Sequence, residues 1–259
     1  MRKSVRTILT ILLVIIIPFL IYAYLQVRSL NEDEKMADAI YEKQMETVLF
    51  SLNQYADDRM QQWVSRLEDK ENPVNRNAAS LVLGNEAIQL LVVRHLRDKK
   101  DSLCYNDYVS AKIGTSEEIE KWYANNDSTL SKLADYLKAG FQKIQPATGL
   151  PVIEGLNSSQ TSMTVMLYDK DSTLNNALFI FDTNYWVESV LGAKMQEIAR
   201  DEFLVSVVQK SEIDQEPSII YSTGDFNPGK EFTERALWIL PEIYLTIQSK
   251  GISYSELIG

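Results

Sequence analysis

Residues that could support enzymatic chemistry are scarce in this chain. His95 is the only histidine and Cys104 the only cysteine among 259 residues, so a zinc cluster with the usual ligand spacing cannot be built. No GxxxxGKS/T, GxGxxG or GxSxG pattern occurs, so the sequence contains none of these phosphate-binding, dinucleotide-binding or nucleophile motifs. Carboxylates are plentiful, but no nucleophile has an adjacent base. Whether the chain is an enzyme stays uncertain, and catalysis is the weakest function class.

The two rare residues have ordinary interpretations. His95, in VVRHLRDKK, could be a phosphoacceptor or a ligand, but no partner Cys, His or acidic motif accompanies it. A solvated position at a helix end is therefore favoured. Cys104, in SLCYNDY, has apolar and aromatic neighbours, which favours burial over an intermolecular disulfide. We expect no catalytic residue, no metal and no cofactor.

The chain is acidic, with 26 Lys and Arg against 36 Asp and Glu and a net charge of −10. Four of the basic residues and none of the acidic residues precede residue 29, so the remainder carries a net charge of −14. A field of this sign disfavours nucleic acid and anionic lipid headgroups as partners. Its simplest consequence is solubility.

An apolar run near the N-terminus organises the rest of the chain. Residues 8–25 (ILTILLVIIIPFLIYAYL) carry no charge and approach the roughly 20 residues that a helix needs to cross a bilayer. Three basic residues precede the run and an acidic cluster at 32–34 follows it, which keeps the N-terminus in the cytoplasm. The sequence thus predicts a single-pass inner-membrane protein with the bulk of the chain periplasmic.

The competing interpretation of this run is a cleaved secretory signal, which also has a basic start. The run is longer than the roughly 7–15 apolar residues of such signals, and no small-x-small cleavage site follows it. An uncleaved anchor is therefore favoured. No second apolar span follows before Gly259, and whether the chain is a fragment that lacks one stays open.

Helical patterns dominate the first two thirds of the sequence. Residues 31–70 contain no Gly or Pro and repeat apolar residues at steps of three and four, which predicts one long helix leaving the anchor. Its apolar stripe is either core for its own domain or a surface on which two copies pair. Further helices are expected over residues 77–99, 115–123 and 128–144, the last two separated by a break at Asn125-Asn126-Asp127.

From residue 161 the apolar pattern favours strands. Residues 162–168 and 177–181 are β-rich runs separated by a turn at 169–172, and Asp182 opens an amphipathic helix to about residue 200. Two more strands are expected over 203–209 and 218–222. The last candidates are 237–240 and, past Pro241, 243–247.

The order of these elements in residues 162–223 resembles extracytoplasmic Cache/PAS-like sensor domains. FIFDTNYWVESVLGAKMQEI is similar to their segment in which a strand ends in an acid before a pocket-covering helix. FLVSVVQKSEIDQEPSIIYSTGD is similar to the strand–turn–strand that follows there. ALWILPEIYLTIQSKGISYSEL looks like the end of the sensor region of Bacteroidetes-type histidine kinases. The resemblance covers residues 160–257, plus the anchor and long helix by layout.

One short motif departs from this family. Glu120-Lys121-Trp122-Tyr123-Ala124 resembles the R-x-W-Y-x-x-A signature of amino-acid-binding Cache domains, but position 120 is Glu where the signature has Arg. The arginine fork is what binds a ligand carboxylate in that chemistry. We therefore predict no amino-acid site here.

The resemblance implies a pocket between the sheet and the helices that cover it, with polar groups at strand ends as ligand contacts. The candidate residues are Tyr168, Asp169, Asp182, Trp186 and Tyr221. Three of them have a competing interpretation. Asp182 is then a helix N-cap, and Trp186 and Tyr221 are core residues whose polar tips have a hydrogen-bond partner.

Together these patterns predict an α+β protein with three parts. They are a cytoplasmic tail and transmembrane anchor (1–28), a long helix with a helical layer (29–160), and a PAS/Cache-like antiparallel sheet (161–259). The resemblance implies the input part of a two-component sensor histidine kinase, a homodimer through its long helix, which passes the state of a small ligand or of the envelope to an output. The alternative is a membrane-tethered interaction or assembly protein that binds an envelope protein and no small molecule.

Overall fold

The computed structural model describes residues 2–106, 116–140, 144–146, 159–169, 171–199, 202–210, 218–227, 229 and 232–250. The chain divides into two compact units, one described over residues 2–47 and the other over residues 48–250. The first unit consists of the greater part of helix α1 (Arg2–Leu67), and the last turns of α1 belong to the second. The helix predicted over residues 31–70 is thus confirmed, ending three residues earlier than expected.

The membrane-spanning helix predicted over residues 8–25 is wrong on this structure. In the part of the chain that is described, no helix is both long enough and apolar enough to cross a bilayer. The described side chains of the run begin at Ile16, and residues 16–25 are about half of the roughly 20 apolar residues that a span needs. Arg28, Glu32 and Asp33 then interrupt the apolar sequence. The side chains of residues 8–15 lie outside the described ones.

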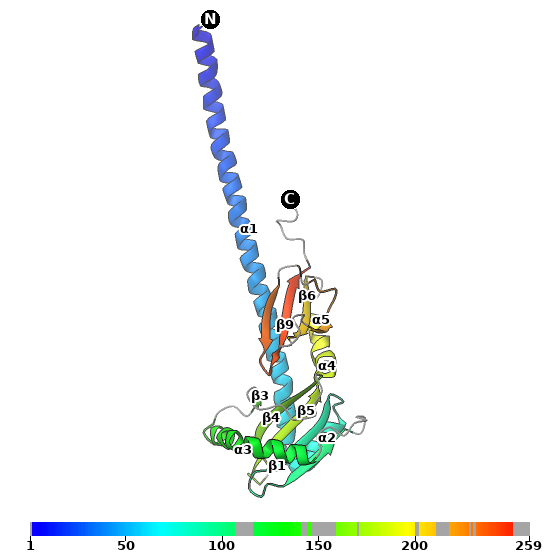
Figure 1. The fold of residues 1–259 in the computed structure, drawn as a ribbon. Coiled ribbons are helices and arrows are strands. Elements are labelled where there is room, and N and C mark those ends of the chain that lie inside the picture. The colour runs from blue at the N-terminus through cyan, green and yellow to red at the C-terminus, as the bar shows by residue number, and fades with distance from the viewer. Residues whose placement is uncertain are drawn as a thin grey trace. The chain divides into compact units, whose positions relative to one another are not determined.

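The second unit contains a five-stranded antiparallel sheet, which we call the first sheet. Its strands lie in the order β2-β1-β5-β4-β3 (Figure 1). Their bounds are β1 Ile88–His95, β2 Asp101–Tyr105, β3 Ile144–Pro146, β4 Gln160–Tyr168 and β5 Leu174–Asp182. The β4–β5 hairpin predicted from residues 162–181 is confirmed, with Tyr168 opposite Leu174 at its turn.

The first sheet contains strands from the stretch that the sequence predicts to be helical. Helix α2 (Val74–Leu83) ends at Gly84, and β1 follows where residues 77–99 were expected to continue as helix. The apolar run of β1 is buried on both faces, and such a run has no alternation to distinguish it from a buried helix. The predicted single C-terminal sheet is therefore corrected to two sheets, the first of which begins at residue 88. The domain boundaries at residues 28 and 160 stay predictions.

Helix α3 (Ser116–Lys138) covers one face of the first sheet as a single helix (Figure 1). The break expected at residues 125–127 does not occur. Asn126 is buried, and its Nδ2 donates to the carbonyl of Trp122 one turn earlier, at 2.7 Å. The amide side chain that signals a turn in isolation is thus satisfied by the helix itself.

The second sheet is also antiparallel, with the order β7-β6-β9-β8. Its strands are β6 Phe203–Gln209, β7 Ser218–Ser222, β8 Thr233–Leu237 and β9 Leu240–Ser249. Helix α4 (Thr183–Trp186), the π-helical segment η1 (Val187–Gly192) and helix α5 (Ala193–Ala199) join β5 to β6. The helix predicted after Asp182 and the strands predicted over 203–209 and 218–222 are confirmed.

Strand β5 is packed on both faces. Phe179 and Phe181 face the last turns of α1, where the Trp63 ring lies 6.0 Å and 6.3 Å from theirs. Leu178 and Ile180 face α3 and join the apolar cluster that includes Trp122, Tyr123 and Leu130. This strand therefore lies between α1 and α3.

We expect Trp63→Ala to lower the free energy of unfolding by about 3–5 kcal/mol, because Trp63 is 6% exposed and fills the space over β5. Trp238→Ala is the control, since Trp238 is 41% exposed and meets Phe50 edge-on. Urea unfolding of both variants checks the comparison. Equal losses in the two would contradict the place given to Trp63 in the core.

Candidate functional site

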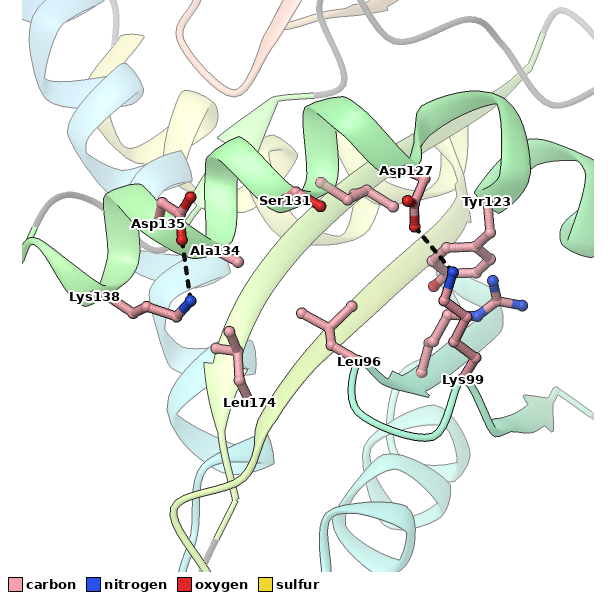
Figure 2. A pocket seen from close by; sticks show the side chains of 11 residues that line it. Leu96, Lys99, Tyr123, Asp127, Ser131, Ala134, Asp135, Lys138 and Leu174 are labelled. Atoms are coloured by element: carbon pink, nitrogen blue, oxygen red, sulfur yellow. Dashed lines mark hydrogen bonds and ion pairs between the residues drawn. The ribbon is translucent and has the colours of Figure 1, made fainter.

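A cavity of about 390 Å³ lies between α3 and the end of the first sheet at which β1 finishes and β5 starts. We call it the α3 pocket, and Figure 2 shows its lining. Its volume falls in the usual range for small-molecule sites, about 300–1,000 Å³. Apolar side chains form its inner wall: Leu96, Leu130, Ala134 and Leu174.

Strand register places a row of side chains across the first sheet beneath α3, and Arg94 of this row lines the α3 pocket. Arg94 on β1 lies opposite Asp101 on β2 and Asn176 on β5, and Asn176 lies opposite Met166 on β4. Directly opposed residues in an antiparallel pair present their side chains on the same face. These four side chains therefore form one row across the sheet beneath α3.

Tyr123 of α3 lies over this row and is almost fully buried. Its hydroxyl donates to Asn176 Oδ1 at 2.9 Å, and Asn176 Nδ2 donates to Thr164 Oγ1 at 2.6 Å and to the carbonyl of Val165 at 3.2 Å. Burial raises the pKa of Tyr123 far above its ordinary value, and the carboxylate of Asp101 raises it further. Tyr123 and Asn176 are thus neutral, and their polar atoms are hydrogen-bonded within the protein.

Arg94 is the buried cation of the row, with 7% of its side chain exposed. Its guanidinium binds both carboxylate oxygens of Asp101, lies 3.2 Å from Glu120 Oε2 and stacks 3.7 Å above the Tyr123 ring. Burial alone lowers the pKa of Arg94, but the hydrogen bond and charge of Asp101 more than offset that effect and raise it. The charge of Arg94 is therefore neutralised within the protein.

The structure shows what lies beside Glu120, the position at which the sequence departs from the R-x-W-Y-x-x-A signature. A guanidinium does lie beside Glu120, but it belongs to Arg94 and is bound by Asp101 on both oxygens. The fork that would bind a ligand carboxylate is therefore occupied. The expectation that this is not an amino-acid site of that kind stays a prediction.

Two exposed ion pairs form the rim of the α3 pocket (Figure 2). Lys99 Nζ lies 3.5 Å from Asp127 Oδ1, and Lys138 Nζ lies 3.0 Å from Asp135 Oδ1. Lys99 adopts φ +54° in the β1–β2 turn, a left-handed conformation that costs a non-glycine residue roughly 1–2 kcal/mol. Exposed pairs of this type contribute little stability, so their side chains are available to exchange partners with a bound molecule.

The five candidate residues from the sequence do not gather at this pocket. Tyr168 ends β4 and packs partly against the apolar cluster under α3. Asp169 organises the hairpin turn, where its Oδ1 accepts from the amides of Asp171 and Thr173 at 2.9 Å and 2.8 Å. Neither lines the cavity.

The remaining three candidates lie farther along the chain. Asp182 is the N-cap of α4 and accepts from the amide of Tyr185 at 3.0 Å. Trp186 is fully buried beside Phe181, and its Nε1 has no hydrogen-bond partner among the described residues. Tyr221 of β7 packs closely against Gly192 and its hydroxyl accepts from Gln196 Nε2 at 3.1 Å.

The β4–β5 hairpin separates these candidates into groups. Tyr168 and Asp169 lie at its turn, whereas Asp182 ends β5 eight positions after Leu174. At about 3.4 Å per residue the two ends are roughly 27 Å apart, too far for one small molecule to contact both. Their roles in ligand binding stay predictions, but they cannot share one site.

The residues that do line the α3 pocket were not predicted, because they meet only through register and packing. Arg94 sits in residues 77–99, which the sequence favours as helix, and Tyr123 belongs to a motif whose arginine this sequence lacks. His95 ends β1 instead of a helix, and Cys104 is half-buried on β2, where burial raises the pKa of its thiol. Within the described residues no group of His, Cys, Asp and Glu could hold a metal ion.

The buried polar groups of the α3 pocket are held by internal partners. No side chain in the described lining of the pocket is a nucleophile paired with a base. Comparison with known protein families and with curated protein sequences gives no match for this chain. The proposed function is therefore based on the fold and on this pocket.

Tyr123→Phe should lower the free energy of unfolding by about 1–2 kcal/mol near neutral pH, because Asn176 Oδ1 loses its buried donor. The raised pKa means that the folded wild type keeps a proton that the unfolded chain loses above a pH of about 10. Wild-type stability then falls by up to about 1.4 kcal/mol per pH unit there, while the variant lacks this loss. Urea unfolding of both proteins across this range tests the difference, and a stability gap that does not narrow above pH ~10 would contradict the buried hydroxyl.

Proposed function

We propose that this protein is the sensing part of a two-component-type receptor, in which a small molecule binds in the α3 pocket and α1 passes the bound state to an output. One observation carries the proposal: the pocket and α1 lie against opposite faces of the same strand, β5. The Cache/PAS-like resemblance supports it, because that family implies a pocket between an antiparallel sheet and the helices over it.

The route between the two faces is short. Leu174 of β5 lines the pocket, and Asn176 on the same face of the strand accepts from the hydroxyl of Tyr123, which also lines it. Phe179, on the other face of the strand, packs under Trp63 of α1. A molecule that moves α3 against the sheet displaces the support of α1 within a few residues of β5. Packed cores pass such shifts on because they are rigid and close-packed.

The lining indicates a ligand with an apolar body and a polar end. Leu96 and Leu174 offer apolar contact, while Lys99 and Asp127 offer a cation and a carboxylate at the rim. The histidine-kinase output and a location outside the cytoplasm stay predictions, as does a role for any partner protein.

A cavity-filling variant tests the pocket directly. Ser131 is exposed on α3 and lines the pocket, so Ser131→Trp places an indole in it; Lys132→Trp adds the same group at the next position, outside the lining. A thermal-shift screen of the full chain against small metabolites, ions and oligosaccharides should give a hit. At 100 times its Kd a ligand adds about 2.7 kcal/mol of stability, a shift of several degrees.

The hit should persist in Lys132→Trp and vanish in Ser131→Trp, with both variants folded by circular dichroism. A hit that survives in Ser131→Trp would place the ligand elsewhere. A broad screen without any shift would favour the alternative, an interaction or assembly protein with no small-molecule ligand.

We further propose that two copies pair through α1, as the resemblance implies. Leu20, Val27, Leu30 and Tyr41 are each at least half exposed along the first unit. They follow one another at spacings that fit a single heptad seam. Such a seam buries apolar surface only when a second helix packs against it.

Leu30→Glu should shift the full chain from dimer to monomer in sedimentation equilibrium, because it places a charge in the seam. Ala39→Glu introduces the same side chain on the opposite side of the heptad and should leave the mass unchanged. A monomeric wild type, or equal effects of the two variants, would overturn pairing through this face.

A further inference from the structure

A second cavity, of about 360 Å³, lies where α1 ends and α2 begins. Arg66 lines it from the last turn of α1, Asp69 and Asn72 from the connecting segment, and Arg76 and Ser80 from α2. We call it the α1–α2 cavity. It shares no lining residue with the α3 pocket.

Asn77 holds the two walls of this cavity together. Its side chain is 9% exposed, and its Nδ2 donates to the carbonyls of Leu67 at 3.2 Å and Asp69 at 2.8 Å. Asn77 belongs to α2, whereas Leu67 is the last residue of α1, whose carbonyl lacks an intrahelical donor, and Asp69 follows in the connecting segment. The relative placement of the two arginine-bearing segments is therefore fixed by the protein itself.

Arg66 and Arg76 are both exposed, and neither has an ionic partner in the part of the chain that is described. Among the described residues, neither guanidinium forms a hydrogen bond. Asp69 is the acidic residue of the lining, and its Oδ1 accepts from the amide of Glu71 at 3.1 Å. Arg76 also stands in the first turn of α2, which contains no acidic residue, so the positive end of the helix disfavours its charge.

We propose that the α1–α2 cavity binds a phosphate-type oxyanion between Arg66 and Arg76. A guanidinium presents paired N–H donors that match two oxygens of such an anion, and two guanidiniums neutralise a dianion. The hydroxyl of Ser80 and the amide of Asn72 supply neutral donors in the same lining. Inorganic phosphate, or the phosphate group of a small metabolite, has this chemistry. The proposal stands independently of ligand binding in the α3 pocket.

Isothermal titration of the full chain with sodium phosphate, at an ionic strength held constant with sodium chloride, tests the site. We expect saturable binding with one phosphate per chain. Arg66→Gln and Arg76→Gln should each weaken it about tenfold or more, because each removes charge-assisted hydrogen bonds. Arg97→Gln is the charge-matched control, since Arg97 is exposed and lies outside the cavity, and it should bind phosphate as the wild type does.

Two further comparisons make the outcome decisive. Malonate, a dicarboxylate, should bind more weakly than phosphate at the same ionic strength, and binding of equal strength would overturn the assignment to a phosphate-type anion. Glucose 6-phosphate then separates a free ion from a metabolite phosphate as the source, and binding of either one supports the site. Absence of saturable phosphate binding, or an equal loss in Arg97→Gln, would overturn the proposal, provided that circular dichroism shows each variant folded.

Discussion

The packing of β5 between two helices is the constraint on which the second unit depends. One face of the strand presents Phe179 and Phe181 to Trp63 of α1, and the other presents Asn176 to Tyr123 of α3. A strand packed on both faces cannot shift without disturbing both helices, because protein interiors have few voids to absorb the movement. The apolar contact supplies stability, whereas the buried Tyr123–Asn176 hydrogen bond fixes how α3 sits over the sheet.

The same packing explains which features could be predicted from the sequence. The long helix, the β4–β5 hairpin and the cap at Asp182 depend on local signals, and these predictions are confirmed. Strand β1 lies where the sequence predicts helix, because periodicity alone does not distinguish an apolar run buried on both faces from a buried helix. The helix break expected at Asn126 does not occur, because its side-chain amide donates to the carbonyl of Trp122 within α3 and is buried.

The α3 pocket was beyond prediction for a related reason. Arg94, Asp101 and Asn176 come together through antiparallel register, and no spacing along the chain encodes that row. The resemblance implies ligand contacts at strand ends, but Asp169 and Asp182 there complete a turn and a helix cap. Asp is favoured in turns and at helix starts because its side chain accepts from nearby backbone amides, whether or not a ligand binds. The α1–α2 cavity differs, because its two arginines form no side-chain hydrogen bond or ion pair with the described residues.

We propose above all that the α3 pocket and α1 are coupled through β5. Amide hydrogen exchange of Ser131→Trp, in which an indole occupies the pocket, compared with Lys132→Trp, tests this coupling without knowledge of the ligand. We expect exchange in Ser131→Trp to change in α3, in β5 and in the turns of α1 around Trp63, with no such change in Lys132→Trp. A change confined to α3 would contradict the coupling and leave α1 a structural support alone.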